Sequence, residues 1–134
     1  MRRRTFLAGL GAGAASLAGC TASGSSEYDV GMSSSAFVPA QITVSAGETV
    51  VWENTSARPH TVTLYEGSHP EGAEYFASGG FDSEQAARDA WPGAGGIVSG
   101  ETYSHTFELP GEYVYFCIPH EPARMVGTVT VTEE

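Results

Sequence analysis

The sequence has no lysine and few cations of any kind. Its six basic residues are all arginines, against sixteen acidic residues, and three of them (Arg2, Arg3, Arg4) lie at the start. From residue 20 onward three arginines face sixteen carboxylates, a formal balance of −13. No basic patch is available to neutralise phosphates, which excludes nucleic-acid binding. A dispersed acidic surface is instead typical of a protein adapted to high salt, where screening weakens self-repulsion. An ordinary acidic exported protein is the alternative.

Long hydrophobic runs are also missing. Residues 6–20 are uncharged, but they are too few, and too many of them are small, for a membrane span. The motif Arg3-Arg4-Thr5-Phe6-Leu7 before this stretch fits a twin-arginine export signal, and Leu17-Ala18-Gly19-Cys20 at its end fits a lipobox. We therefore predict a signal peptide over residues 1–19, lipid on the thiol of Cys20, and anchoring to the outer face of the cell membrane.

Cysteine is scarce, with one residue at position 20 and one at position 117. Two cysteines in an exported protein would suggest a disulfide, but a lipidated Cys20 leaves Cys117 free for another role. Residues 20–35, which include a Ser-rich stretch, are predicted to be a tether. Residues 36–134 are then long enough for one domain with one core.

Metal-binding side chains crowd into one short segment, where Cys117, His120 and Met125 follow an apolar strand. Pro119 and Pro122 are suited to turning this segment back on itself. With a remote histidine, one thiolate, two imidazoles and a thioether form the ligand set of a blue-copper electron-transfer site, in which the thioether is a weak axial ligand. Taken singly, Cys117 is more often a buried structural thiol and Met125 a core residue.

His60 is the best candidate for the remote ligand. It follows Pro59 and a turn-like segment, and it opens a strand predicted over residues 60–64 that places His60, Val62 and Leu64 on one face. His69 lies in a polar loop and is predicted to be solvated. His105 lies mid-strand on the same face as Tyr103 and Phe107 and is predicted to be a packed, hydrogen-bonded histidine.

Short alternating segments separated by Gly, Pro and Ser predict an all-β, antiparallel sandwich. The cleanest strand lies near the end of the chain, with Val129 and Val131 inward and threonines outward. Residues 65–100 form a less regular insert. Within it, residues 82–90 are predicted to form a short helix that Asp82 caps and Pro92 stops.

Residues 36–132 resemble a plastocyanin-type cupredoxin and, more narrowly, the halocyanins, small blue copper proteins of halophilic archaea. The ligand loop has two residues between Cys and His and four between His and Met, as in plastocyanin-like members. The other matching segments are residues 50–54, 59–60, 81–83, 111–117, 119–121 and 125–131. The resemblance implies a Greek-key β-sandwich and one copper ion, Cu(I) or Cu(II), bound by His60, Cys117 and His120 with Met125 axial.

Two positions depart from the family pattern. The ligand histidine is often followed by an asparagine that ties the ligand loops together, whereas this chain has Thr61. Plastocyanins of photosynthesis have tyrosine just before the ligand cysteine as a second electron entry region, whereas this chain has Phe116 there and Tyr115 one position earlier. We therefore do not expect the remote docking site.

The predicted function is transfer of single electrons between redox proteins of a membrane chain by a monomer that is not an enzyme. Partners are expected to dock at the His120 edge, within an apolar patch that includes Ile118, Pro119 and Pro122. Arg124 either orients an acidic partner or is a solvated loop residue. A copper carrier or storage protein is the alternative, although three methionines, one of them at the start, do not favour storage. An enzyme would need a second, open copper site with its own histidines.

Overall fold

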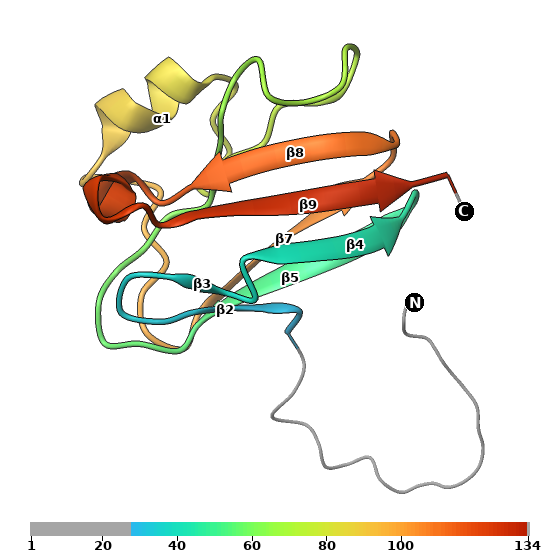
Figure 1. The fold of residues 1–134 in the computed structure, drawn as a ribbon. Coiled ribbons are helices and arrows are strands. Elements are labelled where there is room, and N and C mark those ends of the chain that lie inside the picture. The colour runs from blue at the N-terminus through green and yellow to red at the C-terminus, as the bar shows by residue number, and fades with distance from the viewer. Residues whose placement is uncertain (1–27, 134) are drawn as a thin grey trace, which may run out of the picture.

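The computed structural model describes residues 28–133, which form two four-stranded sheets packed face to face (Figure 1). One sheet has the order β3 (Phe37–Val38), β2 (Val30–Met32), β5 (Glu48–Asn54), β7 (Thr102–Phe107). The other has the order β4 (Gln41–Ser45), β9 (Val126–Thr132), β8 (Gly111–Phe116), β6 (Thr63–Leu64). The predicted β-sandwich is confirmed. The sheets are mixed rather than purely antiparallel, because β2 pairs with β5 and β4 with β9 in parallel.

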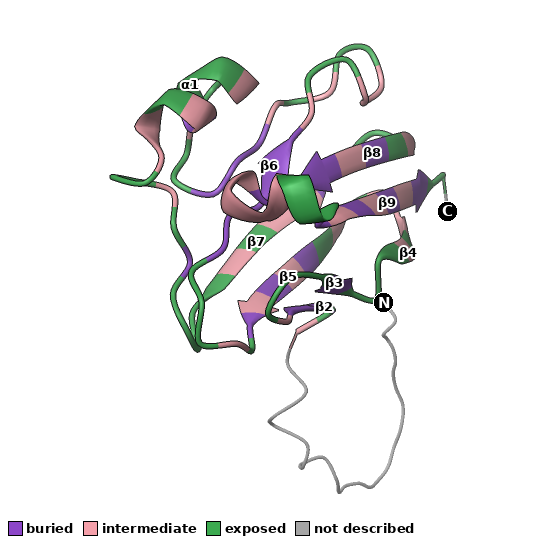
Figure 2. Cartoon of the chain, turned by 60° about the vertical axis from the view of Figure 1, so that its left-hand side comes forward, coloured by how far each residue is buried: buried purple, intermediate pink, exposed green. Residues whose placement is uncertain are grey.

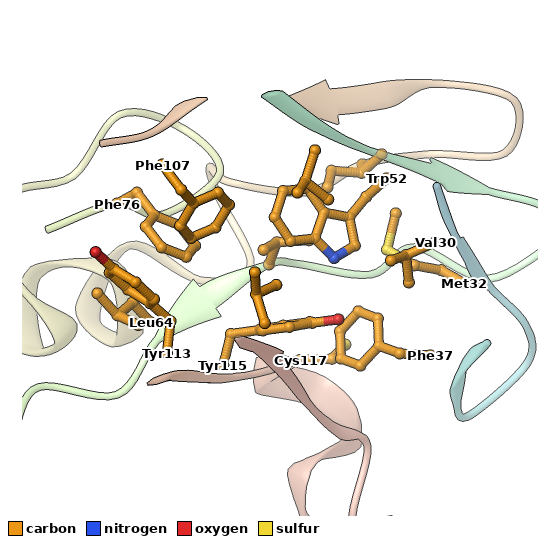
Figure 3. Packing of buried hydrophobic residues seen from close by; sticks show 14 of the residues in the cluster. Val30, Met32, Phe37, Trp52, Leu64, Phe76, Phe107, Tyr113, Tyr115 and Cys117 are labelled. Carbon is orange, nitrogen blue, oxygen red and sulfur yellow. The ribbon is translucent and has the colours of Figure 1, made fainter. Parts of the chain in front are cut away.

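The alternation of side chains along the strands explains why the sheets stack. In β9, Val129 and Val131 are buried while Thr132 is exposed, as predicted. In β5, Trp52 is fully buried between the sheets, where its ring contacts Tyr115 edge-on at 5.3 Å. Figure 3 shows Trp52 among the packed aromatic rings, and Figure 2 shows buried segments on the strands of both sheets. Every second side chain along these strands points inward, and the inward side chains of the two sheets together form one continuous core.

The domain begins earlier than predicted. Residues 20–35 were expected to be a tether, but Val30 and Met32 of β2 are fully buried, and β2 pairs with both β3 and β5. This strand has only three residues, so its alternation is too short to stand out from the Ser-rich sequence around it. The signal peptide predicted over residues 1–19, Cys20 and the Ser-rich stretch before residue 27 lie outside the described residues.

The segment that starts at His60 also differs from its prediction. Only Thr63 and Leu64 form a strand, β6, and all five residues from 60 to 64 are buried rather than every second one. His60 forms an isolated bridge with Ile97, and Thr63 forms one with Ala77. A strand with one solvent-facing side would expose Thr61 and Thr63. Here the insert covers that side, so both threonines are buried.

Helix α1 (Glu84–Ala90) lies within the insert, at the end of the sandwich where the turn η2 (Ile118–Ala123) is found (Figure 1). Its cap is Ser83, whose side chain accepts a hydrogen bond from the N–H of Ala86, and not Asp82 as predicted. Ser83 has the extended backbone that an N-cap requires, and Pro92 follows just after the end, as expected. No helix within residues 28–133 has the length and apolar character to cross a membrane.

Candidate metal centre

The ligand loop joins the end of β8 to the start of β9 and is closed by its own backbone. The N–H of His120 donates to the carbonyl of Cys117 at 3.2 Å, and the N–H of Met125 donates to that of His120 at 3.2 Å. The N–H of Cys117 donates in turn to the carbonyl of Met125 at 3.0 Å. Arg124 takes the left-handed conformation, with φ of 65°, that turns the chain into β9. Three of the four predicted ligands are thus fixed on one hydrogen-bonded turn.

Two histidine rings turn the same nitrogen toward the thiol. Nδ1 of His60 lies 3.5 Å from Sγ of Cys117, and Nδ1 of His120 lies 3.4 Å from it. The two rings are 4.7 Å apart between centroids, and the donor atoms of all three residues lie within 4.8 Å of one another. Metal–nitrogen bonds of about 2.0 Å and metal–sulfur bonds of about 2.3 Å hold donors roughly 3.5 Å apart around one ion. The two nitrogen–sulfur separations fit a single metal ion between these side chains.

Met125 ends the ligand loop, where its backbone bonds to both Cys117 and His120. Its side chain is fully buried and belongs to the same core as Cys117, which is also fully buried. A thiolate, two imidazoles and a thioether together would give a soft, mixed donor set of the kind that suits copper in both oxidation states. His120, by contrast, is only half-buried, so the site reaches solvent on its side.

Thr61 links the two ligand-bearing segments through hydrogen bonds. Its hydroxyl accepts the N–H of Ile118 at 2.8 Å, and its own N–H donates to Sγ of Cys117 at 3.4 Å. Thr63, also buried, donates its hydroxyl to that of Thr61 at 3.1 Å. The bracing hydrogen bond that the sequence left in question is therefore present, with threonine in place of asparagine.

A second polar residue organises the loop before His60. Asn54 is buried, and its amide donates to the carbonyls of Arg58 at 2.6 Å and Ile97 at 2.7 Å. Its side-chain oxygen accepts the N–H and the hydroxyl of Ser56, each at 2.8 Å. The hydroxyl oxygen of Ser56 is hydrogen-bonded to Nε2 of His60 at 3.0 Å, which leaves Nδ1 of the ring for the metal. Such partners fix ring orientation and tautomer in metal sites.

The electrostatic environment keeps the imidazoles in the form that binds metal. Burial and the neighbouring His120 lower the pKa of His60 to about 4. Burial and the Arg58 guanidinium lower the pKa of His120. Burial raises the pKa of the Cys117 thiol, opposed by the hydrogen bond from Thr61. Both rings are therefore neutral near pH 7, and a metal ion displaces only the proton of the thiol.

The family model for "Copper binding proteins, plastocyanin/azurin family" matches residues 25–132. The chain belongs to this family. Its cofactor is one copper ion, and its general role is that of a cupredoxin electron-transfer protein. Membership is consistent with the expectation that it is not an enzyme.

Individual relatives support the same placement. Plastocyanin of Scenedesmus fuscus is 38% identical over 95 residues, 71% of this chain and 85% of that protein. The minor chloroplastic plastocyanin of Arabidopsis thaliana is 38% identical over 96 residues, so the match spans 72% of this chain but only 50% of that longer protein. Among solved structures, amicyanin of Paracoccus versutus superposes with a TM-score of 0.53 at 27% identity, covering 79% of this chain and 82% of that one.

Beside this cupredoxin site, an aromatic and charged cluster connects the insert to the ligand loop. Tyr65 stacks on Phe116, the residue before Cys117, at 4.2 Å, and its hydroxyl donates to Glu121 at 2.6 Å. Arg88 of α1 lies over the ring of Phe116 at 4.4 Å and pairs with Glu121 at 2.8 Å. Arg88 also pairs with Glu84 at 2.8 Å. The insert thus braces Phe116, just before the ligand loop, and Glu121 within it.

This brace has a measurable consequence. We expect Arg88→Gln to lower the free energy of unfolding of the copper-free protein by about 1 kcal/mol, because it removes a partly exposed ion-pair network and a cation–π contact. Glu84→Gln is the matched control, since it removes only the pair within the helix. Urea titration followed by tryptophan fluorescence measures both. Equal midpoints for the two variants would contradict a brace between α1 and the ligand loop.

The predicted docking residues lie on the ligand loop, and the two remaining histidines lie outside the metal-binding cluster. On the loop surface, Ile118 and Pro119 are half-buried, and Pro122 and Arg124 are exposed. His105 packs on Phe76, with ring centroids 4.3 Å apart, and lies outside the metal-binding cluster. His69 is also outside it, and is half-buried rather than solvated.

Ser56 and Arg58, which were not among the predicted site residues, also lie at the site. Nη1 of Arg58 lies 3.4 Å from Nε2 of His120, although 62 residues separate them in the chain. The signal available in the sequence was their position just before Pro59-His60, on the segment that carries the remote ligand. Tyr115 is fully buried, and its ring centroid lies 4.6 Å from that of Phe37.

Proposed function

We propose that this protein is a membrane-anchored blue copper protein that carries single electrons between redox partners at the outer face of the cell membrane. The observation that carries the proposal is the convergence of Nδ1 of His60, Nδ1 of His120 and Sγ of Cys117, within 4.8 Å, on a scaffold already held by hydrogen bonds. A site arranged in advance needs little rearrangement when copper changes its oxidation state.

In this proposal His60, Cys117 and His120 would hold copper, and Met125 would add its thioether as a weaker ligand. Copper in such a set supplies a one-electron couple, because thiolate and thioether suit Cu(I) and imidazole suits both states. The protein's own contribution is to hold the ligands still and to keep water away. Cys117, His60 and Met125 are fully buried. The N–H of Thr61 holds the Cys117 thiol, and the hydroxyl of Ser56 holds the His60 ring.

The buried donor set also favours an electron carrier over a copper carrier. Handing over the ion requires exchange of ligands with a partner, and His120 alone among the proposed ligands is not buried. Partner docking is proposed at the His120 edge, on the surface formed by Ile118, Pro119, Pro122 and Arg124. Electron transfer at this edge would not require a partner to replace any of the proposed ligands.

Anchoring is proposed from sequence motifs. The twin-arginine motif at residues 3–4 and the Leu-Ala-Gly-Cys segment ending at Cys20 support export and lipid attachment. The acidic, lysine-free composition supports a high-salt setting, in line with the halocyanin-like motifs.

The test of the central proposal is optical and redox titration of the copper(II)-loaded protein. We expect an intense absorption band at about 600 nm, as thiolate ligation of the blue-copper kind produces. Stepwise reduction should bleach it with one electron per protein, and reoxidation should restore it fully. A folded protein that binds copper without this band, or that releases the ion on reduction, would replace the electron carrier by the copper carrier.

A further inference from the structure

The contact between Arg58 and His120 joins two hydrogen-bond donors. His120 turns Nδ1 toward Sγ of Cys117, so its other nitrogen, Nε2, carries the ring proton when Nδ1 binds metal. Arg58 has only N–H donors and is always charged. Its Nη1 lies 3.4 Å from Nε2 on the exposed side of the site. Neither group can accept from the other, so both need an acceptor from outside.

The surrounding charge makes this spot exceptional on the molecule. Residues 28–133 contain three arginines, and all of them lie at the copper end: Arg58 against His120, Arg88 against Glu121, and Arg124 within the ligand loop. Arg88 is neutralised by ion pairs with Glu84 and Glu121. Among the described residues, Arg58 and Arg124 make no such pair, and of these two Arg58 is the one that contacts His120. An acidic chain therefore presents a free cation next to the half-buried ligand edge.

We propose that Arg58 and the Nε2–H of His120 together bind a carboxylate of the redox partner. The inference rests on the proposed function, since it concerns where the electron leaves. A guanidinium fork and a neighbouring N–H match the two oxygens of an aspartate or glutamate side chain. The partner is then a redox protein with a carboxylate beside its own redox centre. Away from the copper end the acidic surface repels such a partner, so this contact directs docking to that end.

Small redox ions of opposite charge test the spot without a known partner. Hexacyanoferrate(III), a trivalent anion, and tris(phenanthroline)cobalt(III), a trivalent cation, both oxidise the copper(I) protein, and stopped-flow absorbance gives each second-order rate constant. The variant is Arg58→Gln. The control is Thr132→Glu, which changes the net charge equally at the far end of β9, where Thr132 is exposed. About 20 Å of strand separates it from Met125.

At 0.1 M salt, a unit charge within about 7 Å of a trivalent anion changes the rate of encounter with that anion roughly fivefold. A unit charge beyond about 20 Å changes this rate by about a tenth. We expect Arg58→Gln to slow oxidation by hexacyanoferrate about fivefold, after correction for any change in reduction potential, and not to slow oxidation by the cobalt complex. Thr132→Glu should leave both rates nearly unchanged. Arg58→Lys, which keeps the charge, should recover most of the rate.

A second readout does not depend on electron transfer. Hexacyanochromate(III) is paramagnetic and should broaden the NMR signals of residues 58 and 118–120 in the copper(I) protein, and broaden them less in Arg58→Gln. Equal slowing by Arg58→Gln and Thr132→Glu, or broadening spread evenly over the surface, would overturn the carboxylate spot while leaving the electron carrier intact. Absence of exchange with either oxidant would overturn the proposed function and this inference together.

Discussion

Cys117→Ser should abolish the absorption band at about 600 nm completely, because that band requires a thiolate bound to copper(II). Serine is close to cysteine in size, so the fully buried position is still filled. Its hydroxyl is a poor ligand at neutral pH, whereas the thiol loses its proton on binding. We expect the variant to fold, to bind copper(II) only weakly through the remaining imidazoles, and to exchange no electrons at a useful rate.

The chain offers its own control for this substitution, since its second cysteine is Cys20. Cys20→Ser should leave the blue band unchanged and release the protein from the membrane fraction, which mass spectrometry and fractionation measure. Circular dichroism shows whether Cys117→Ser is folded. A blue band that survives in folded Cys117→Ser would contradict thiolate ligation, and membrane retention of Cys20→Ser without added lipid mass in the native protein would contradict the anchor.

The metal-binding cluster was largely predictable because its information is local. Cys117, His120 and Met125 are close in the chain, and two prolines and the strand before them indicate a turn at the end of a sheet. His60 is remote, yet the adjacent Pro59 and the worse surroundings of the other histidines indicated it. Residue spacing does not show which nitrogen each imidazole turns toward the Cys117 thiol, because this depends on Ser56 and on the conformation of the ligand loop.

What the sequence did not reveal depends on pairing between distant segments. β2 has three residues, and its burial follows from strands on both sides of it. The five buried residues from 60 to 64 lose their alternation because the insert covers them, through bridges to Ala77 and Ile97. Arg88 and Tyr65 reach the ligand loop from the same insert. This irregular segment thus contributes two of the residues that hold the ligand loop from outside.

Thr61→Val isolates the hydrogen bond between the two ligand-bearing segments. Valine has nearly the same shape as threonine but cannot accept the N–H of Ile118, and the site is buried, with Thr61 1% exposed. Leaving a buried donor without a partner costs about 1–3 kcal/mol. Removing a partner that orients metal ligands weakens metal binding by about 10- to 100-fold. The backbone N–H that donates to Sγ of Cys117 is kept, so we expect the blue band to remain while copper affinity falls by that factor.

Thr63→Val is the matched control, because it removes a hydroxyl that donates to Thr61 and leaves the bond from Ile118 in place. Competition with a copper(I) chelator measures affinity, and urea unfolding of the copper-free variants measures stability. A drop in affinity for Thr61→Val that exceeds the drop for Thr63→Val means that the threonine after His60 holds the ligand loop. Equal affinities in both variants and the native protein would instead assign that role to the loop's own backbone bonds between Cys117 and Met125.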